Sequence, residues 1–271
     1  MPDEDTVRIL TIFARYGTTR FADAETRLGQ MFATQVPHVE RDVVVVDSAL
    51  PVGIHETSQR RTVCGGDNSG REFSAFESAL ETVGSAVWDY DLVNLTTAAF
   101  SEMYAAYLQR FRQPVLDAIA NEPVCLGHVD CYNEPIEVLG TTSQHWLRTC
   151  CVFLPPAELR ILGALQSTRD RTLWFSGIPE RPFRPDAPLS ENYQQLLIDW
   201  LTGEDIGQGV RWHSRLRLDP AGLPEFEQKA MAILNEHLFG IRLRAAGCHT
   251  VDVTWLSSVL GRSHSRDWNT P

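Results

Sequence analysis

Residues 63–76 combine residue types that could bind an anion. They read Val-Cys-Gly-Gly-Asp-Asn-Ser-Gly-Arg-Glu-Phe-Ser-Ala-Phe, which predicts a short strand, a glycine-rich turn and the start of a helix. Ser69 and Glu72 have the spacing of a capping box, in which the two side chains satisfy free amides at a helix N-terminus. Such an N-terminus offers amides and a positive dipole end to a phosphate. The alternative is a well-capped helix that binds nothing.

The charge balance narrows the classes of function. The chain has 271 residues, of which 43% are apolar and 22% are charged, as in an ordinary globular protein. Lys and Arg total 24 against 35 Asp and Glu, so the formal net charge is −11. This balance argues against a nucleic-acid-binding protein, because such proteins need a basic surface. The negative net charge is still compatible with a small anionic ligand that binds where arginines and backbone amides lie close together.

The sequence predicts a cytoplasmic protein without a membrane span. No apolar run approaches the roughly 18 residues that a span requires, and the acidic N-terminus lacks the features of a signal peptide. Peripheral contact with the inner membrane face stays open, although we see no basic amphipathic helix that would anchor the chain. The six cysteines are expected to be reduced and mostly buried. The spacing of Cys125, His128 and Cys131 does not match a zinc site.

The first half of the chain predicts alternating strands and helices. Four valines followed by Asp47 are typical of a central parallel strand that is buried on both faces. We expect strands at residues 7–13, 42–47, just before the glycine-rich turn, and at 88–95, with helices at 21–32, 70–83 and from Ser101 to a break at Pro114. This order favours an α/β fold with crossover helices.

The second half is less regular. We expect strands at 124–130 and 148–154 with a polar loop at 137–145 between them, helices at 157–165, 191–202 and 224–246, an extended segment at 176–188, and a polar tail after Leu260. The predicted division is a core of residues 1–175 and a helical C-terminal extension of residues 176–271 packed on the same domain.

The order of these motifs resembles a known family. Phe13-Ala14-Arg15-Tyr16-Gly17, Val46-Asp47-Ser48 and Asn68-Ser69-Gly70-Arg71-Glu72-Phe73 are similar to the nucleotide-sugar-binding half of GT-A glycosyltransferases. More narrowly, the chain resembles bacterial glycosyltransferase-like proteins of surface-polysaccharide loci, related to the rhamnan-synthesis type, which have segments similar to residues 145–149 and 232–237. The resemblance spans residues 7–256. It implies a GT-A-like mixed, mostly parallel sheet flanked by helices, with a helical C-terminal part.

The resemblance also implies an activity and its partners. The chain would move a sugar from a nucleotide-diphosphate donor to a glycan or lipid-linked glycan acceptor in cell-surface polysaccharide assembly. The donor contacts that it implies are Arg15, Tyr16, Gly17, Asp47, Asn68, Arg71, Thr96 and Thr97. The chemistry agrees, because Asp47 can accept from a base amide or ribose hydroxyls and Arg15 can meet a phosphate.

One departure from the family concerns the metal. GT-A enzymes usually carry Asp-x-Asp where this chain has Thr96-Thr97-Ala98. Asp89 and Asp91 have the right spacing but lie at the start of the predicted strand, which is the wrong end for the site. We therefore assign no cofactor. A divalent Mg or Mn ion stays an alternative, and without it cations such as Arg15, Arg71 or Arg148 would have to neutralise the leaving group.

Inverting sugar transfer needs a base for the acceptor hydroxyl. We assign this catalytic role to Asp130 or Glu236, with His237 and Glu72 as further candidates. The competing interpretations are a turn aspartate for Asp130, a solvated helix face for Glu236, a packed histidine for His237 and a cap for Glu72.

The acceptor side of the predicted site consists of Trp146, Arg148 and His237. An indole face stacks on the apolar face of a sugar, but it serves equally as a core anchor. A non-catalytic GT-A-like binding or scaffold module is the second hypothesis. A nucleotidyltransferase is a weaker third one, since it needs clustered carboxylates that the sequence does not show.

Overall fold

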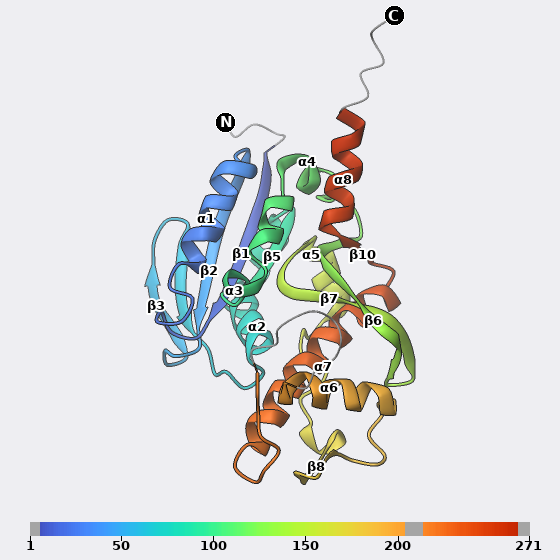
Figure 1. Ribbon diagram of the computed structural model, residues 1–271. Helices are drawn as coiled ribbons and strands as arrows, with labels where there is room; N and C mark the ends of the chain where they lie inside the picture. Colours follow the sequence, from blue (N-terminus) through green and yellow to red (C-terminus); the bar gives the residue numbers. More distant parts are fainter. Residues whose placement is uncertain (1–5, 204–213, 265–271) are drawn as a thin grey trace, which may run out of the picture. The chain divides into compact units, whose positions relative to one another are not determined.

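A computed structural model describes residues 6–203 and 214–264 (Figure 1). The described residues fall into two compact units. The first lies within Met1–Val129, Leu147–Leu165 and Arg242–Pro271, and the second within Asp130–Trp146 and Gln166–Ile241. The division into units therefore does not follow the boundary that we placed at residue 175. In the part of the chain described, no helix is long and apolar enough to cross a membrane.

A mostly parallel sheet forms the centre of the fold. Among the described residues it has eight strands in the order β10-β6-β7-β5-β1-β2-β4-β3. β1 pairs in parallel with β2 and β5, β2 with β4, and β10 with β6, whereas β3 and β7 run antiparallel to β4 and β5. The strands are β1 (Val7–Arg15), β2 (Val39–Asp47), β3 (Gly53–Thr57), β4 (Arg61–Gly65), β5 (Leu92–Thr97), β6 (Val124–Val138), β7 (Thr141–Leu154) and β10 (His249–Asp252).

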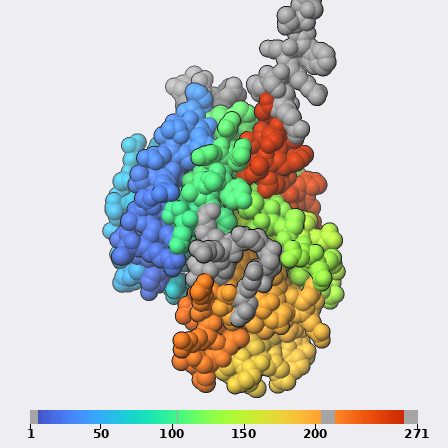
Figure 2. Space-filling model, in the orientation of Figure 1, coloured from blue at the N-terminus to red at the C-terminus, as the bar shows by residue number. Residues whose placement is uncertain are grey.

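Helices cover the sheet in the first unit. They are α1 (Ala24–Gln35), α2 (Glu72–Val83), η1 (Gly84–Asp89), α3 (Phe100–Met103), η2 (Ala105–Arg110), α4 (Gln113–Asp117), α5 (Pro156–Leu162) and α8 (Val253–His264). Ile9 and Phe13 on β1 pack in one core cluster with apolar residues of α1, α4 and α8. The intervening residues point to the opposite face of the strand. Figure 2 shows α1 beside the segment of α3 and η2, and α1 contacts both.

The second unit has its own apolar core. Its elements are η3 (Arg171–Leu173), β8 (Phe175–Ile178), β9 (Arg181–Phe183), α6 (Glu191–Thr202) and most of α7 (Leu223–Ala245). Trp174, Tyr193, Trp200 and Phe226 are among its large buried side chains. The predicted helices at 191–202 and 224–246 are therefore confirmed, apart from one residue at each end of α7.

Strands lie in three segments for which we predicted no strand. Residues 48–58 include β3, the expected extended segment at 176–188 includes most of β8 and all of β9, and the expected loop at 137–145 is part of a hairpin of β6 and β7. The hairpin turns at Leu139 and Gly140, whose φ angles are 50° and 72°. Both values suit the two-residue turns that join antiparallel strands. Gly140 is a turn signal inside the predicted loop, but Leu139 is not, so the sequence did not show that the connection is only two residues long.

Two strand placements also differ from the prediction. The strand expected at 88–95 is β5 at Leu92–Thr97, so Asp89 lies in η1 and Asp91 precedes the strand. β10 was not predicted at all. The part of the tail beyond residue 264 lies outside the described residues.

Candidate functional site

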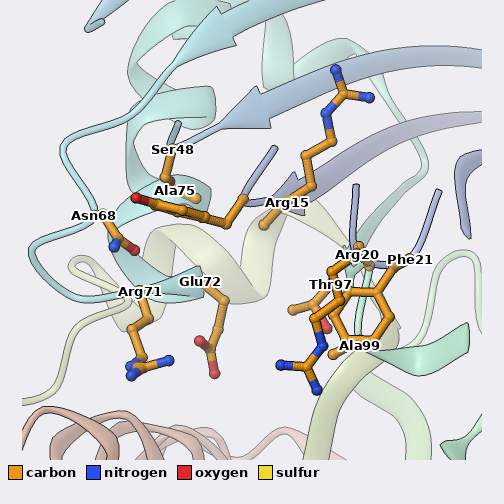
Figure 3. A pocket seen from close by; sticks show the side chains of 13 residues that line it. Arg15, Arg20, Phe21, Ser48, Asn68, Arg71, Glu72, Ala75, Thr97 and Ala99 are labelled. Carbon is orange, nitrogen blue, oxygen red and sulfur yellow. The ribbon is translucent and has the colours of Figure 1, made fainter. Parts of the chain in front are cut away.

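The first unit has a cavity at the carboxyl edge of its parallel strands. The chain leaves β1 toward β2 on one side and returns to β5 on the other side of β1. The strand order therefore reverses at β1, and open α/β sheets bind ligands outside the carboxyl ends of the strands at such a point. The cavity measures about 410 Å³, within the usual range for ligand pockets (Figure 3). It is lined by Ala14, Arg15, Tyr16, Arg20, Phe21, Ser48, Asn68, Arg71, Glu72, Ala75, Thr97, Ala98 and Ala99.

Two glycines let the chain segments around this cavity approach each other closely. A Cβ atom on Gly65, the last residue of β4, would lie 1.8 Å from the Pro51 carbonyl oxygen. A Cβ atom on Gly66 would lie 2.9 Å from a Val46 methyl group. Any larger residue would therefore push away the turn after β2, which carries Ser48 of the cavity lining.

The turn after these glycines has an unusual backbone. Asn68 and Arg71 both have positive φ, at 55° and 53°. Asparagine tolerates this region, but arginine adopts it at an energetic cost. Strained residues persist where the surrounding structure fixes them, and they cluster at functional sites.

The predicted capping box does not form. The Ser69 amide and hydroxyl both donate to the Asp67 carboxylate, at 2.9 Å to Oδ1. The Gly70 amide donates instead to the Ser74 hydroxyl at 3.1 Å. Asp67 lies two residues before Ser69 and offers a charged acceptor, which forms a stronger hydrogen bond than a neutral one. α2 consequently begins at Glu72, two residues later than predicted.

Three arginines line the cavity, and they differ in how they are held. Arg15 donates from Nε to Asp47 at 2.8 Å and from Nη1 to Glu25 at 3.1 Å. Arg20 forms an exposed ion pair with Glu102 at 3.0 Å. The Nε of Arg71 is buried and has no hydrogen-bond partner in residues 6–203 and 214–264. Arg71 therefore has hydrogen-bond donor capacity to offer a ligand.

Asp47 holds the loop that follows β1. Its carboxylate accepts from the Gly17 amide at 2.7 Å, the Ala49 amide at 3.1 Å and Arg15. Burial of Asp47 alone would raise its pKa, but the donors from Gly17, Ala49 and Arg15 outweigh it and lower the pKa. Asp47 and Gly17 do not line the 410 Å³ cavity, whereas Tyr16 does and is 67% exposed. The structure thus places Asp47 behind the cavity wall as a support for the loop.

The two threonines at the end of β5 face opposite ways. Thr97 lines the cavity, while the Thr96 hydroxyl is fully buried and donates to the Asn94 side chain at 2.9 Å. Successive residues of a strand point to opposite faces, so only one of a pair can reach the ligand side. Thr96 belongs instead to a buried polar cluster with Asn94 and Cys151.

Asp89 and Asp91 lie before β5, at the amino edge of the sheet. Asp91 accepts from the Arg8 amide at 2.7 Å, and the Asp89 carbonyl accepts from the Arg8 guanidinium at 2.8 Å. Both aspartates are thus at the opposite edge from the cavity. Within the described residues, no group of three or more His, Cys, Asp and Glu side chains could hold a metal ion.

Four of the predicted catalytic and acceptor residues belong to the second unit. Asp130 lies inside β6, which continues to Val138, so its expected position at the end of a strand was wrong. Glu236 and His237 lie on α7. Trp146 and His237 are each only 1% exposed.

His237 is packed at the centre of an aromatic cluster. Its Nδ1 lies 2.8 Å from the Tyr132 hydroxyl and is also hydrogen-bonded to the Tyr193 hydroxyl. Burial raises the pKa of Tyr193 well above its ordinary value, and the charges of Tyr132 and Glu236 add to this effect. The Trp146 ring packs 4.6 Å from Tyr132 and 5.0 Å from His237 between ring centroids. This packing leaves Trp146 and His237 almost no surface for a sugar ring.

Arg148 belongs to the first unit. It lies on β7, is 6% exposed, and places its guanidinium 5.1 Å from the centre of the Tyr104 ring. Its aromatic contact and burial are those of a packed arginine, and its contact with an acceptor stays a prediction.

The cavity also contains residues that sequence reasoning missed. Arg20, Phe21 and Ser48 line it, and the Arg20 guanidinium lies 4.7 Å from the centre of the Phe21 ring. Each of them lies in a loop that directly follows a parallel strand, which is the signal that could have identified them. Comparison of the chain with models of protein families, with curated proteins and with solved structures found no match.

Proposed function

We propose that the chain is a glycosyltransferase with a GT-A-like fold. It binds a nucleoside-diphosphate sugar in the cavity at the carboxyl edge of the sheet and transfers the sugar to a glycan acceptor in cell-surface polysaccharide assembly. One observation carries this proposal. Arg71, Arg20 and the start of α2 line the same cavity, and this cavity lies at the point where the strand order reverses.

The proposed diphosphate site rests on positive charge from several sources. Arg71 offers its buried Nε, and an arginine fork matches the geometry of phosphate oxygens. α2 begins beside it, so the positive end of the helix dipole adds to the field. Arg20 is exposed and could exchange its contact with Glu102 for a phosphate, because exposed ion pairs contribute little energy.

The same cavity offers a surface for the rest of the donor. Tyr16 lines it with a largely exposed ring, on which a nucleobase could stack. Asn68, Ser48 and Thr97 add hydrogen-bonding groups of the kind that orient ribose and sugar hydroxyls. In a transfer without metal, Arg71 and Arg20 would stabilise the charge on the leaving diphosphate.

Calorimetric titration of the protein with UDP, GDP and dTDP, each with and without Mn²⁺, tests the proposal. We expect at least one of these ligands to bind, and Arg71→Ala to weaken it by at least tenfold, since a hydrogen bond to a charged group contributes about 1.5–3 kcal/mol. The matched control is Arg27→Ala, because Arg27 is an exposed arginine on α1 that pairs only with Asp23 in the described residues. Absence of binding by all three ligands, or equal effects of the two variants, would contradict the proposal.

A second candidate is a non-catalytic GT-A-like binding module. It is favoured by Thr96-Thr97-Ala98, which stands in place of the acidic pair that holds metal in the family. Such a module would bind a nucleoside diphosphate in the same cavity but would not release it from a sugar donor. Detection of free nucleoside diphosphate after incubation with sugar donors separates the two candidates.

A further inference from the structure

The first unit has a second cavity at the first turn of α1. It measures about 310 Å³. Arg41 of β2, Thr18 of the loop after β1, and Glu25 and Thr26 of α1 are among the residues that line it. Arg71 lines only the first cavity, whereas Arg41 lines only the second. The two cavities can therefore be tested independently of each other.

Arg41 brings a positive charge to this cavity without a full set of hydrogen bonds. Its guanidinium lies 4.2 Å from the centre of the Phe32 ring on α1. Its Nη1 is buried and has no hydrogen-bond partner within residues 6–203 and 214–264. Burial lowers the pKa of Arg41, and the charge of Glu25 offsets this effect in part. The aromatic ring attracts the cation, but it does not replace the oxygen acceptors that a buried guanidinium requires.

The two acids beside Arg41 in the chain have other partners. Glu40 pairs with Arg60 at 3.2 Å, and Asp42 accepts from the Tyr90 hydroxyl at 2.8 Å. Successive residues of a strand also point to opposite faces of the sheet. Both carboxylates are therefore on the face away from Arg41 and do not balance its charge.

Glu25 is the one carboxylate among the described residues that line the second cavity, and arginines balance its charge. It accepts from Arg61 Nε at 2.7 Å and from Arg15 Nη1 at 3.1 Å. Arg15 lines both cavities, and in Figure 3 its guanidinium points away from that of Arg71. With Arg41 added, the second cavity has an excess of positive charge that favours an anionic ligand.

We infer that the second cavity binds a phosphate group, either as inorganic phosphate or as the terminal phosphate of a small organic ester. The phosphate oxygens accept from the guanidinium of Arg41, whose planar fork matches their geometry. The hydroxyls of Thr18 and Thr26, which are exposed residues of the lining, are further donors. These donors belong to three separate segments of the chain, an arrangement that suits a tetrahedral anion better than a planar carboxylate. The inference is independent of the proposed function, because it concerns a different cavity.

The test is a calorimetric titration of the full chain at constant ionic strength. One series uses inorganic phosphate and a second uses glycerol 3-phosphate, so that the free ion and an organic ester are compared. Arg41→Gln removes the charged donor, and Thr26→Val removes a hydroxyl at an exposed position. The matched control is Arg27→Gln, because Arg27 is an exposed arginine of α1 that pairs with Asp23 and does not line the cavity.

We expect at least one of the two ligands to bind to the wild type and to raise its melting temperature. Arg41→Gln should weaken binding at least tenfold and abolish this rise, because it removes charge-assisted hydrogen bonds. Thr26→Val should weaken binding a few-fold, since a neutral hydroxyl contributes less, and Arg27→Gln should match the wild type. Tighter binding of glycerol 3-phosphate would assign the site to an ester, and tighter binding of phosphate to the free ion; both support the inference.

Other results overturn the inference. One is that neither ligand binds to the wild type, and another is that Arg41→Gln and Arg27→Gln weaken binding equally. If Arg41→Gln does not fold, Thr26→Val decides, and unchanged binding by that variant overturns the inference.

An Arg71→Gln variant separates this inference from the proposed function. Loss of phosphate binding in Arg71→Gln, together with normal binding in Arg41→Gln, would place the phosphate in the first cavity. That result overturns the inference and leaves the proposed function standing. Phosphate binding that depends on Arg41, in a protein that binds no nucleoside diphosphate, would have the opposite meaning: the inference stands and the proposed function falls.

Discussion

Replacement of Gly65 with alanine should destabilise the first unit by about 3 kcal/mol through a clash with backbone. The added Cβ atom would lie 1.8 Å from the Pro51 carbonyl oxygen and 2.6 Å from that of Leu50. Real Cβ atoms essentially never come closer than 3.0 Å to such atoms, so the turn must move by more than 1 Å. A flexible side chain could rotate away from the clash, but a backbone carbonyl cannot.

The size of the expected destabilisation follows from the hydrogen bonds that the turn after β2 makes. The Leu50 amide donates to the Asp47 carbonyl at 3.0 Å, and the Ala49 amide donates to the Asp47 carboxylate at 3.1 Å. Loss of one such hydrogen bond costs about 1 kcal/mol, and overpacking adds about 1–3 kcal/mol. For a domain of this size the melting temperature should fall by about 6–12 °C. Binding of a nucleoside diphosphate should weaken as well, because Ser48 of the cavity lining lies in the turn.

Gly29→Ala is the matched control. Gly29 lies inside α1, and a Cβ atom there would have no neighbour within 4 Å. Alanine is a better helix former than glycine by up to about 1 kcal/mol, so this variant should be slightly more stable than the wild type. Thermal and urea unfolding followed by circular dichroism would measure both effects. A Gly65→Ala protein within about 0.5 kcal/mol of the wild type would refute the reasoning, since that is the range of substitutions without a structural cost.

Three further predictions concern charge, thiols and the second unit. Because the folded-state pKa of Asp47 is lowered, its ionised form stabilises the fold above the unfolded pKa of about 3.9, and this contribution is lost as the pH falls through the lower folded value. The Asp47→Asn variant should therefore be less stable than the wild type at pH 7, and it should lose less stability than the wild type as the pH falls below 4. Urea midpoints of both proteins, measured across this pH range, test this expectation. Parallel pH dependences of the two midpoints would contradict it. Cys131 is exposed, whereas Cys125 and Cys248 are buried. Burial raises the pKa of Cys248 to about 12, with a contribution from Glu158, and it raises the pKa of Cys125 well above its usual value. A thiol reagent such as dithionitrobenzoate at pH 8 should modify Cys131 quickly in the native protein and the other two only after unfolding, and rapid native labelling of all three would be inconsistent with their burial. His237→Leu removes the nitrogen shared by two tyrosine hydroxyls and should lower the unfolding free energy by about 2–4 kcal/mol, measured by urea unfolding, whereas a neutral effect would mean that the hydroxyls find other partners.

Much of the first unit could be predicted because its signals are local. The valine run of β2 and the apolar run of β1 identify buried parallel strands without knowledge of their neighbours. Residues at the ends of such strands meet at one edge of the sheet. Of the residues that we predicted to bind the donor, Arg15, Tyr16, Asn68, Arg71 and Thr97 line the cavity. Their contact with a donor remains a prediction.

The features that the sequence did not reveal depend on contacts between segments that are far apart in the chain. The carboxylate of Asp47 is occupied by amides of Gly17 and Ala49, which become neighbours only when two loops pack together. The hairpin of β6 and β7 turns at Leu139 and Gly140, and a leucine at the first position does not indicate a two-residue turn. β10 is only four residues long, which is too short for a periodic pattern. We expected Asp130 at the end of a strand because the sequence did not show that β6 continues to Val138.

The late position of β10 in the chain has a consequence for biosynthesis. β10 pairs in parallel with β6 at the edge of the sheet, and Val253 of α8 is buried in the core that contains β1. On the ribosome β1 emerges first, yet the edge at β6 lacks its neighbour until His249–Asp252 have followed. An unpaired strand edge is a template for association with other chains. From the synthesis of β6 until His249–Asp252 follow, the nascent chain therefore carries an unpaired strand edge at Val124–Gly127, and β10 then pairs with this edge and becomes the outer strand of the sheet.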